Sequence, residues 1–339
     1  MRPNVVLLFA HHHLTKWQPH GGEKSMLAIV QHLRNFGFSV KVMVNNRKTK
    51  DGSSEVIDGV EYMTVQPERF EAQAVLELRK KPDVVLTWGM HSHLIAPLCF
   101  DANVPCVFFL RYWSPMLQPP YDVDHLEGPI QMQERVGFSA AFIYSSKVIC
   151  NCEYAAEQVA RRWPVVPEVC YVPVDKPESP PVGLYRPFVT LVNPARSNGG
   201  GLLLKLAEMM PDVKFQVYGT PERQPPENVT VEPYFNGPYE DMFAKTKVLI
   251  LPADEVSCGT TRVALEAAYC GVPTVSVNIG PASELLPPHW LVSSNDFYTG
   301  WECKVRELYE AEEVTMPDLS RFDAEKSLNK VLGIVENLG

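Results

Sequence analysis

Segments with the period of a strand alternate with segments with the period of a helix along this chain. Residues 4–11 form an apolar run of strand length, and within 21–37 the residues Met26, Ile29 and Leu33 recur at helical spacing before a glycine. Pairs of this kind follow one another through the first half of the sequence. Alternation of strands with helices predicts a parallel sheet covered by helices on both faces, and so an α/β fold.

The alternation is interrupted once, by the proline-rich and charged segment VDKPESPPVGLYRP at residues 174–187. It restarts with the strand FVTLVNPA and the helix GGGLLLKLAEMM. We therefore expect two doubly wound, Rossmann-like domains, of residues 1–176 and 177–319, with an interdomain cleft where ligands meet the carboxyl ends of the strands. Within the first domain, residues 141–152 are expected to form a strand.

Composition restricts the class of protein. With 339 residues, 45% of them hydrophobic and 21% charged, the chain has the profile of a globular protein of two domains and not of a disordered or fibrous one. No apolar run approaches the roughly 20 residues of a membrane helix, and the start MRPNVVLLFAHHH lacks a cleavage site, so we expect a cytoplasmic protein. The net charge of -9 disfavours duplex DNA or an anionic membrane as a partner, and the scattered cysteines favour reduced thiols.

Six segments, in register over most of the chain, carry a resemblance to a known family. They are GGEKSMLAIVQHLRNFGFSVKV, IDGVEY and KPDVVLTWG in the first half, and VNPARSNGGGLLLKLAEMMPDVKF, VLILPA and SCGTTRVALEAAYCGVPTVSVNIGPASELL in the second. The chain resembles the GT-B glycosyltransferases, specifically the family 4 retaining enzymes that use nucleotide-activated sugars.

The resemblance implies an activity as well as an architecture. It implies transfer of a hexosyl group from a nucleoside diphosphate sugar to an acceptor hydroxyl with retention, with UDP the first expectation for the donor and GDP the second. It implies no essential metal. It also implies no enzymic nucleophile, because the leaving diphosphate itself accepts the acceptor's proton. It also implies that the C-terminal helix, residues 320–339, packs back toward the first domain.

The segment SCGTTRVALEAAYCGVP combines a loop, a helix start and one glutamate. Gly259, Thr260 and Thr261 precede a helix whose free N–H groups and dipole suit a phosphate oxygen. Glu266 follows in the second turn, and the resemblance assigns it to the ribose hydroxyls. A purely structural cap or ion pair is the alternative for Glu266.

Three positions depart from the family pattern. Cys258 stands where the family has a glutamate associated with the transferred sugar, and Asp254 or Glu255 could replace that glutamate from the same loop. Asn198 stands at the usual lysine position, and Arg111 stands where the family has a histidine near the sugar. An arginine cannot carry a proton at neutral pH, although it can bind an anionic or hydroxyl-rich group.

Two arginines are candidates to neutralise a diphosphate. The turn NPARSNGGG, which contains Asn193 and Gly199, has glycines that let backbone amides approach a diphosphate closely. Arg196 in this turn and Arg262 at the start of the later helix match the two charges of the leaving group. Either arginine alone could equally be a solvated surface residue.

Other residues complete the predicted donor side. Gly219 and Thr220 end a strand and would border the nucleobase, and Glu284 lies in NIGPASELL, which resembles the family's loop around the sugar and phosphates. A plain turn and a helix cap are the alternatives for these two segments.

Aromatic residues and histidines mark the predicted acceptor side. The long connection HHHLTKWQPHGGEK ends in Gly21 and Gly22, which open a helix and in the resembled family approach the donor phosphates or the acceptor. Consecutive histidines on an extended chain point alternately, so a polar acceptor loop is favoured over a metal site. The acceptor-side residues predicted are His11, His12, His13, Trp17, His91, Tyr112 and Trp113.

Two other functions remain open beside a transferase. The departures at 111, 198 and 258 would suit a catalytically degenerate nucleotide-binding partner subunit. The aromatic segment 111–121 could stack on a flipped, modified base in DNA, although the acidic balance disfavours nucleic acid. The DNA hypothesis predicts that one face gathers Lys16, Arg47, Lys48, Lys50, Arg111, Arg161 and Arg162.

Overall fold

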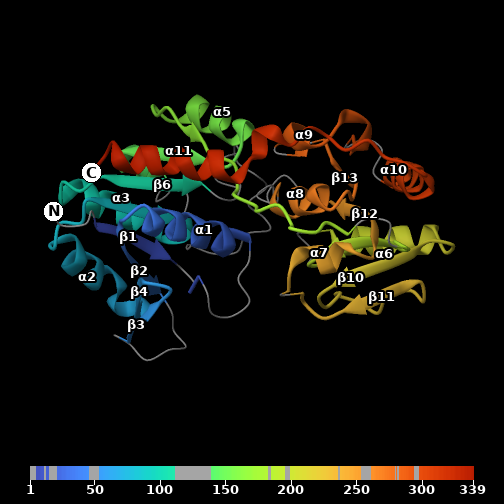
Figure 1. The fold of residues 1–339 in the computed structure, drawn as a ribbon, viewed down its shortest axis with the longest axis horizontal. Coiled ribbons are helices and arrows are strands. Elements are labelled where there is room, and N and C mark those ends of the chain that lie inside the picture. The colour runs from blue at the N-terminus through green and yellow to red at the C-terminus, as the bar shows by residue number, and fades with distance from the viewer. Residues whose placement is uncertain are drawn as a thin grey trace, which may run out of the picture. The chain divides into compact units, whose positions relative to one another are not determined.

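The chain forms two compact units. The first contains the described residues up to Pro173 together with Phe322–Gly339, and the second contains those of Val174–Arg321. Figure 1 shows the ribbon of this computed structural model. The residues that the structure describes are 5–10, 13–14, 21–45, 53–110, 139–181, 185–194, 199–235, 237–252, 261–278, 280, 282–293 and 298–339.

The first unit is built on an eight-stranded sheet. Strand β3 pairs with β4 antiparallel, and the other pairings are parallel. The order across the sheet is β3 (Ser54–Ile57), β4 (Val60–Val65), β2 (Ser39–Asn45), β1 (Val5–Ala10), β5 (Val84–Trp88), β6 (Cys106–Leu110), β7 (Lys147–Cys150) and β8 (Glu168–Val169).

Helices cover both faces of this sheet, because successive side chains of its buried strands point to opposite sides. Val6, Leu8 and Ala10 of β1 join one core cluster with α1 (Gly21–Asn35) and α11 (Ala324–Glu336), which lie next to each other in Figure 1. Leu7 and Phe9 join the other cluster, with α2 (Pro67–Leu78) and α3 (Ser92–Asp101). The remaining helical elements are η1 (Gly89–His91), a helix at residues 139–144 and α5 (Glu153–Arg162).

The C-terminal segment belongs to the first unit. Asp323 caps α11 by accepting a hydrogen bond from the Lys326 N–H at 3.0 Å. The rings of Phe322 and Tyr171 meet edge to face with centroids 4.7 Å apart. Lys330 pairs with Glu168 at 3.0 Å. Among the described residues, the chain passes from the first unit to the second at residues 173–174 and returns at 321–322.

The second unit has a six-stranded sheet whose pairings are parallel. Helices α7 and α8 share a core cluster with Tyr218 and Leu249, and α10 packs on α6 and β12. The strand order is β11 (Val229–Glu232), β10 (Lys214–Tyr218), β9 (Phe188–Val192), β12 (Thr246–Leu251), β13 (Thr274–Val277) and β14 (Leu291–Val292). Its described helical elements are α6 (Gly200–Met209), α7 (Tyr239–Phe243), α8 (Thr261–Tyr269), α9 (Ala282–Leu285), η5 (Pro288–Trp290) and α10 (Thr299–Glu310), and η6 (Ser320–Phe322) spans the boundary with the first unit.

The α/β fold with two doubly wound parallel sheets is confirmed, and one local prediction is wrong. Residues 139–144 are helical, so the strand expected over 141–152 is only the shorter β7. Phe142 explains the difference, because its ring packs on Phe108 at 5.2 Å and stacks on Trp163 at 4.2 Å. This packing against the sheet overrides the strand propensity of the surrounding apolar residues.

Candidate functional site

Each unit has one point at which the strand order reverses direction. In the first unit the chain moves outward through β2 and β4 on one side of β1, and through β5, β6 and β7 on the other. In the second unit the reversal lies between β9 and β12. Ligands of open α/β sheets bind at the carboxyl ends of the strands at such points. The residues that follow β1, β5, β9 and β12 are therefore the candidate site residues.

The described residues on the two sides of the turn after β9 are tightly packed and include positions that need glycine. Asn193 adopts a φ of 59° and donates its N–H to the Tyr218 carbonyl at 2.9 Å. Gly199 has a φ of 82°, and a Cβ there would lie 2.1 Å from Cγ of Pro252. A Cβ at Gly200 would lie 2.0 Å from the Pro194 carbonyl oxygen. A Cβ at either glycine would collide with a proline, so only glycine allows the backbone to pack this closely at the start of α6.

The end of β10 joins the same packing. Gly219 has a φ of 122°, and a Cβ there would lie 2.9 Å from Cδ of Pro194. Its N–H donates to the Glu232 carbonyl at 2.9 Å, and the exposed Thr220 follows. The ends of β9, β10 and β12 therefore converge on Pro194 and Pro252, two residues whose roles the sequence reading missed. The sequence pattern that could have identified them is the proline soon after the strand in both NPA and LPA.

Arg262 and Glu266 form a close ion pair one turn apart on α8. The Arg262 Nε donates to Oε1 of Glu266 at 2.8 Å, and the two side chains are only 18% and 9% exposed. The spacing of four residues places both on one side of the helix. Glu266 is thus a nearly buried carboxylate that the ion pair holds in one orientation. This structural role is compatible with the binding of ribose hydroxyls predicted for Glu266.

The opposite end of α8 is fixed by a residue that the sequence reading did not single out. Arg186 donates to the carbonyls of Cys270 at 2.9 Å and Gly271 at 3.2 Å. These carbonyls end a helix and would otherwise lack partners. Burial raises the pKa of the Cys270 thiol to about 12, so this cysteine is a neutral packing residue.

Glu284 lies on the short helix α9. Gly280 before it has a φ of 54°, and the Ser283 hydroxyl donates to the Gly280 carbonyl at 2.7 Å. The Glu284 carboxylate is 12% exposed and lies 3.9 Å from the guanidinium of Arg321. Arg321 is the last residue of the second unit before the chain returns to the first.

In the first unit, α1 begins at the predicted glycine pair. The Ser25 hydroxyl donates to the Gly21 carbonyl at 2.8 Å. A Cβ at Gly22 would meet no described heavy atom within 4 Å. The space in front of Gly22 is therefore not filled by the described part of the chain.

His13 follows β1 and is packed against the β3–β4 hairpin. It is 4% exposed and stacks on the Tyr62 ring, with centroids 4.2 Å apart. Its Nε2 lies 3.4 Å from Oε1 of Glu55. Burial, and after it the charges of Asp58 and Glu55, raises the pKa of Tyr62 to about 12. His13 thus anchors the β1–α1 connection to the hairpin.

His91 follows β5 and pairs with a residue at the end of β2. Its Nε2 lies 2.8 Å from Nδ2 of Asn45, and its ring lies 4.6 Å from that of Phe70. The buried hydroxyls of Thr87 and Ser92, on either side of it in the chain, pair at 3.1 Å. The Asn45 partner was missed from the sequence, since 46 residues separate it from His91.

Many predicted site residues lie outside the described residues, and their roles stay predictions. Thr261 is described only as the first residue of α8. Those outside are His11, His12, Trp17, Arg111, Tyr112, Trp113, Arg196, Asn198, Asp254, Glu255, Cys258, Gly259 and Thr260.

Within the described ranges, neither a metal centre nor a membrane span is found. No group of three or more His, Cys, Asp or Glu side chains among these residues is placed to hold a metal ion. No described helix has the length and apolar character needed to cross a bilayer. Of the described cysteines, Cys303 is exposed and the other six are buried free thiols.

Solved structures share this architecture over nearly the whole chain. Sucrose-phosphate synthase from Thermosynechococcus elongatus matches with a TM-score of 0.68 at 12% identity, over 99% of this chain and 99% of that one. HepE of Anabaena, solved in complex with UDP, matches with 0.64 at 16% identity, over 98% and 99%. UDP-GlcNAc 2-epimerase from Methanocaldococcus jannaschii matches with 0.57 at 11% identity, over 98% and 99%.

These similarities establish the fold. The chain has the GT-B fold, as the sequence resemblance implied. No protein-family model matches the chain, and no curated protein matches its sequence. Because the fold is shared by proteins with different named activities, the reaction has to be argued from the site.

Proposed function

We propose that this protein is a glycosyltransferase that moves a hexosyl group from a nucleoside diphosphate sugar to an acceptor hydroxyl, with retention. The observation that carries the proposal is the Arg262–Glu266 pair, a nearly buried carboxylate held at 2.8 Å on the helix that follows β12. It lies on the switch-point side of a GT-B unit, where the resemblance places the ribose ligand.

The described residues suit a nucleoside diphosphate in two ways. The Glu266 carboxylate can accept hydrogen bonds from the two ribose hydroxyls while Arg262 fixes its orientation. The ten-residue helix α6 begins at Gly200, and the free N–H groups of its first turn are proposed to face the diphosphate. UDP is the favoured nucleotide of the donor, because the HepE structure contains UDP and the epimerase is named for UDP-GlcNAc.

The proposed reaction needs no enzymic nucleophile. The acceptor oxygen forms its bond to the anomeric carbon as the bond from that carbon to the diphosphate oxygen breaks. The acceptor's proton passes to the departing diphosphate. The protein then contributes positioning and neutralisation of the diphosphate charge, with Arg196 and Arg262 as the proposed cations and without an essential metal.

Calorimetric titration of the purified protein with UDP, GDP, dTDP, ADP and CMP tests the donor site. One nucleoside diphosphate is expected to bind, and Glu266→Gln should weaken it about 10- to 100-fold, the range for hydrogen bonds to a charged group. Glu208→Gln is the matched control, because Glu208 is a surface glutamate of the same unit that pairs with Arg223. Binding that is equal in both variants, or absent in the wild type, contradicts the proposal.

Turnover separates transfer from the other activities. The sugar conjugate of the bound nucleotide is incubated with hydroxyl acceptors, release of the diphosphate is measured, and the anomeric configuration of the product is read by NMR. Release with retention supports the proposal. Conversion of the sugar without release of diphosphate indicates an epimerase, and binding without any turnover indicates the partner-subunit function.

A further inference from the structure

The strands of the first unit begin at one end of the sheet, opposite the switch point. Helices α2, α3, 139–144 and α5 run back to this end before the next strand starts. Strand β5 has five residues, which puts this end roughly 16 Å from the carboxyl ends of the strands. A surface here is therefore distinct from the candidate site.

Large apolar side chains are exposed at each of these helix ends. Phe100 at the end of α3 is 64% exposed and Leu76 in the last turn of α2 is 49% exposed. Ile143, at 54%, and Tyr144, at 40%, end the next helix, and Val166 after α5 is 87% exposed. The rings of Phe100 and Tyr144 meet at 5.2 Å. These five residues form what we call the apolar tips.

Basic residues accompany the apolar tips. Between the last turn of each helix and the next strand, six basic residues stand against four acidic ones, of which Glu77 is buried. Lys80 is paired with Glu77, Arg161 with Glu157 and Glu168 with Lys330. The basic residues outside these pairs outnumber Asp83 and Asp101, so this surface has a small positive excess on a chain whose net charge is -9. The basic residues are Arg79, Lys80, Lys81, Lys147, Arg161 and Arg162.

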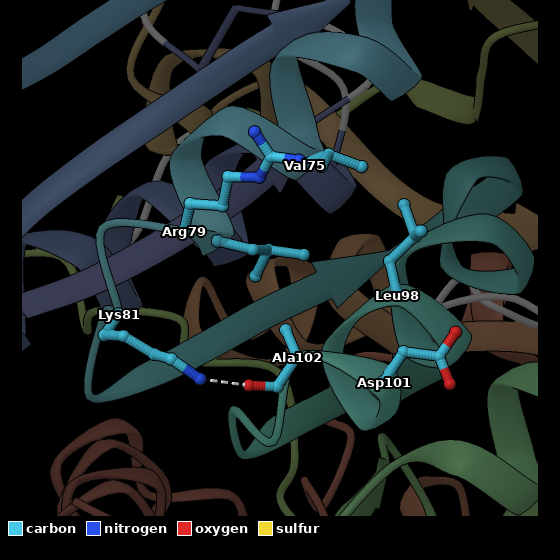
Figure 2. Close-up of a pocket in the computed structure, with 7 residues that line it drawn as sticks. Val75, Arg79, Lys81, Leu98, Asp101 and Ala102 are labelled. Atoms are coloured by element: carbon cyan, nitrogen blue, oxygen red, sulfur yellow. Dashed lines mark hydrogen bonds between the residues drawn. The ribbon is translucent and has the colours of Figure 1, made fainter.

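A recess opens between the ends of α2 and α3 (Figure 2). Its volume is about 290 Å³, and Arg79 and Lys81 line it from the α2 side while Asp101 lines it from α3. The Lys81 ammonium donates to the Ala102 carbonyl. An apolar recess lined by two cations and one carboxylate has a net positive charge, which suits a molecule with an apolar body and an anionic head. The apolar lining is Val75, Leu78, Leu98 and Ala102.

We propose that this end of the first unit, with its apolar tips and basic residues, docks on an anionic lipid surface. Apolar side chains at the ends of four helices, all at the same end of the sheet, can enter a lipid interface together, whereas each alone offers little apolar surface to a groove on a partner protein. Arginine and lysine stems cover apolar surface while their charged heads reach anionic headgroups. The proposal does not depend on the proposed enzymatic activity, and docking at this end leaves the carboxyl ends of the strands accessible.

Flotation with phosphatidylcholine vesicles, with and without phosphatidylserine, tests the proposal. The wild type should float with the phosphatidylserine vesicles only, and less at raised salt. Replacing Arg79, Lys81 and Arg162 by glutamine, which leaves the Lys80–Glu77 pair intact, should lower the partition coefficient about a hundredfold, at roughly fivefold per charge. The matched control replaces Lys205, Lys214 and Lys245 of the second unit by glutamine and should bind like the wild type.

A second pair of variants tests the apolar tips. Phe100→Ser with Ile143→Ser should weaken flotation about tenfold, whereas Val231→Ser with Tyr185→Ser, two exposed residues of the second unit, should not. No flotation of the wild type, or an equal loss in both control sets, overturns the proposal. Light scattering gives a further way to overturn the proposal. If the wild type is a dimer and the Phe100 and Ile143 substitutions dissociate it, the surface binds a second copy of the chain.

Discussion

Gly199→Ala is expected to destabilise the second unit strongly. Gly199 has a φ of 82°, which costs an L-residue with a side chain about 1–2 kcal/mol. The new Cβ would also lie 2.1 Å from Cγ of Pro252, far inside van der Waals contact, so the proline ring or the turn must move. Overpacking of this kind costs about 1–3 kcal/mol, which gives a total of about 2–5 kcal/mol.

Gly201→Ala is the matched control for this substitution. Gly201 lies in the first turn of α6, where a Cβ would meet no described heavy atom within 4 Å. Alanine should therefore be neutral there, or stabilise the helix by up to about 1 kcal/mol. Scanning calorimetry measures both variants, at roughly 2–4 °C per kcal/mol for a unit of this size. Equal melting temperatures of the two variants would refute the packing argument.

Two further predictions concern buried ionisable groups. Burial raises the pKa of Glu77, but the hydrogen bonds and charges of Lys80 and Lys41 outweigh it and hold the pKa below its ordinary value. The ionised carboxylate therefore stabilises the fold at pH values above the pKa that Glu77 has in the unfolded chain. In urea titrations, the difference in free energy of unfolding between the wild type and Glu77→Gln should shrink as the pH falls from about 6 to about 3. The pKa shift of Tyr62 has the opposite direction, because its pKa is raised to about 12. The neutral phenol therefore stabilises the fold below about pH 10, and this stabilisation is lost as the pH rises toward 12. Tyr62→Phe should show a smaller alkaline loss of stability than the wild type, and an equal loss would exclude Tyr62 as its source.

The alternation of strand-like and helix-like hydrophobic patterns predicted the fold, because each pattern reflects which side chains of one element face the core. Val6 and Leu8 of β1 face one core cluster and Leu7 and Phe9 face the other, as a strand buried on both faces requires. Residues 139–144 were mispredicted because Phe142 packs against Phe108, which is 34 positions earlier, and its partner Trp163 lies 21 positions later. No local period encodes a contact of that separation.

The candidate site was predictable where its residues are close in sequence. Arg262 and Glu266 are four residues apart, so their pairing on one side of α8 follows from helix geometry. The glycines of NPARSNGGG were found, but their reason was not, because Pro252 meets Gly199 only through the adjacency of β9 and β12. Arg186 donates to the Cys270 carbonyl at the end of α8, and 84 residues separate the two. A motif within one segment of the sequence does not predict a contact of that separation.

The Arg262–Glu266 pair also limits how a diphosphate could be neutralised. Arg262 was predicted to face the diphosphate, and its Nε already donates to Glu266. A guanidinium has five N–H donors, so binding a phosphate oxygen through its other nitrogens does not require the pair to break. The pair nevertheless has no net charge, because the arginine and the glutamate cancel. A diphosphate that carries two negative charges beside this pair therefore requires at least one further cation. Arg196 in the turn after β9 remains the residue that the sequence predicts for that role.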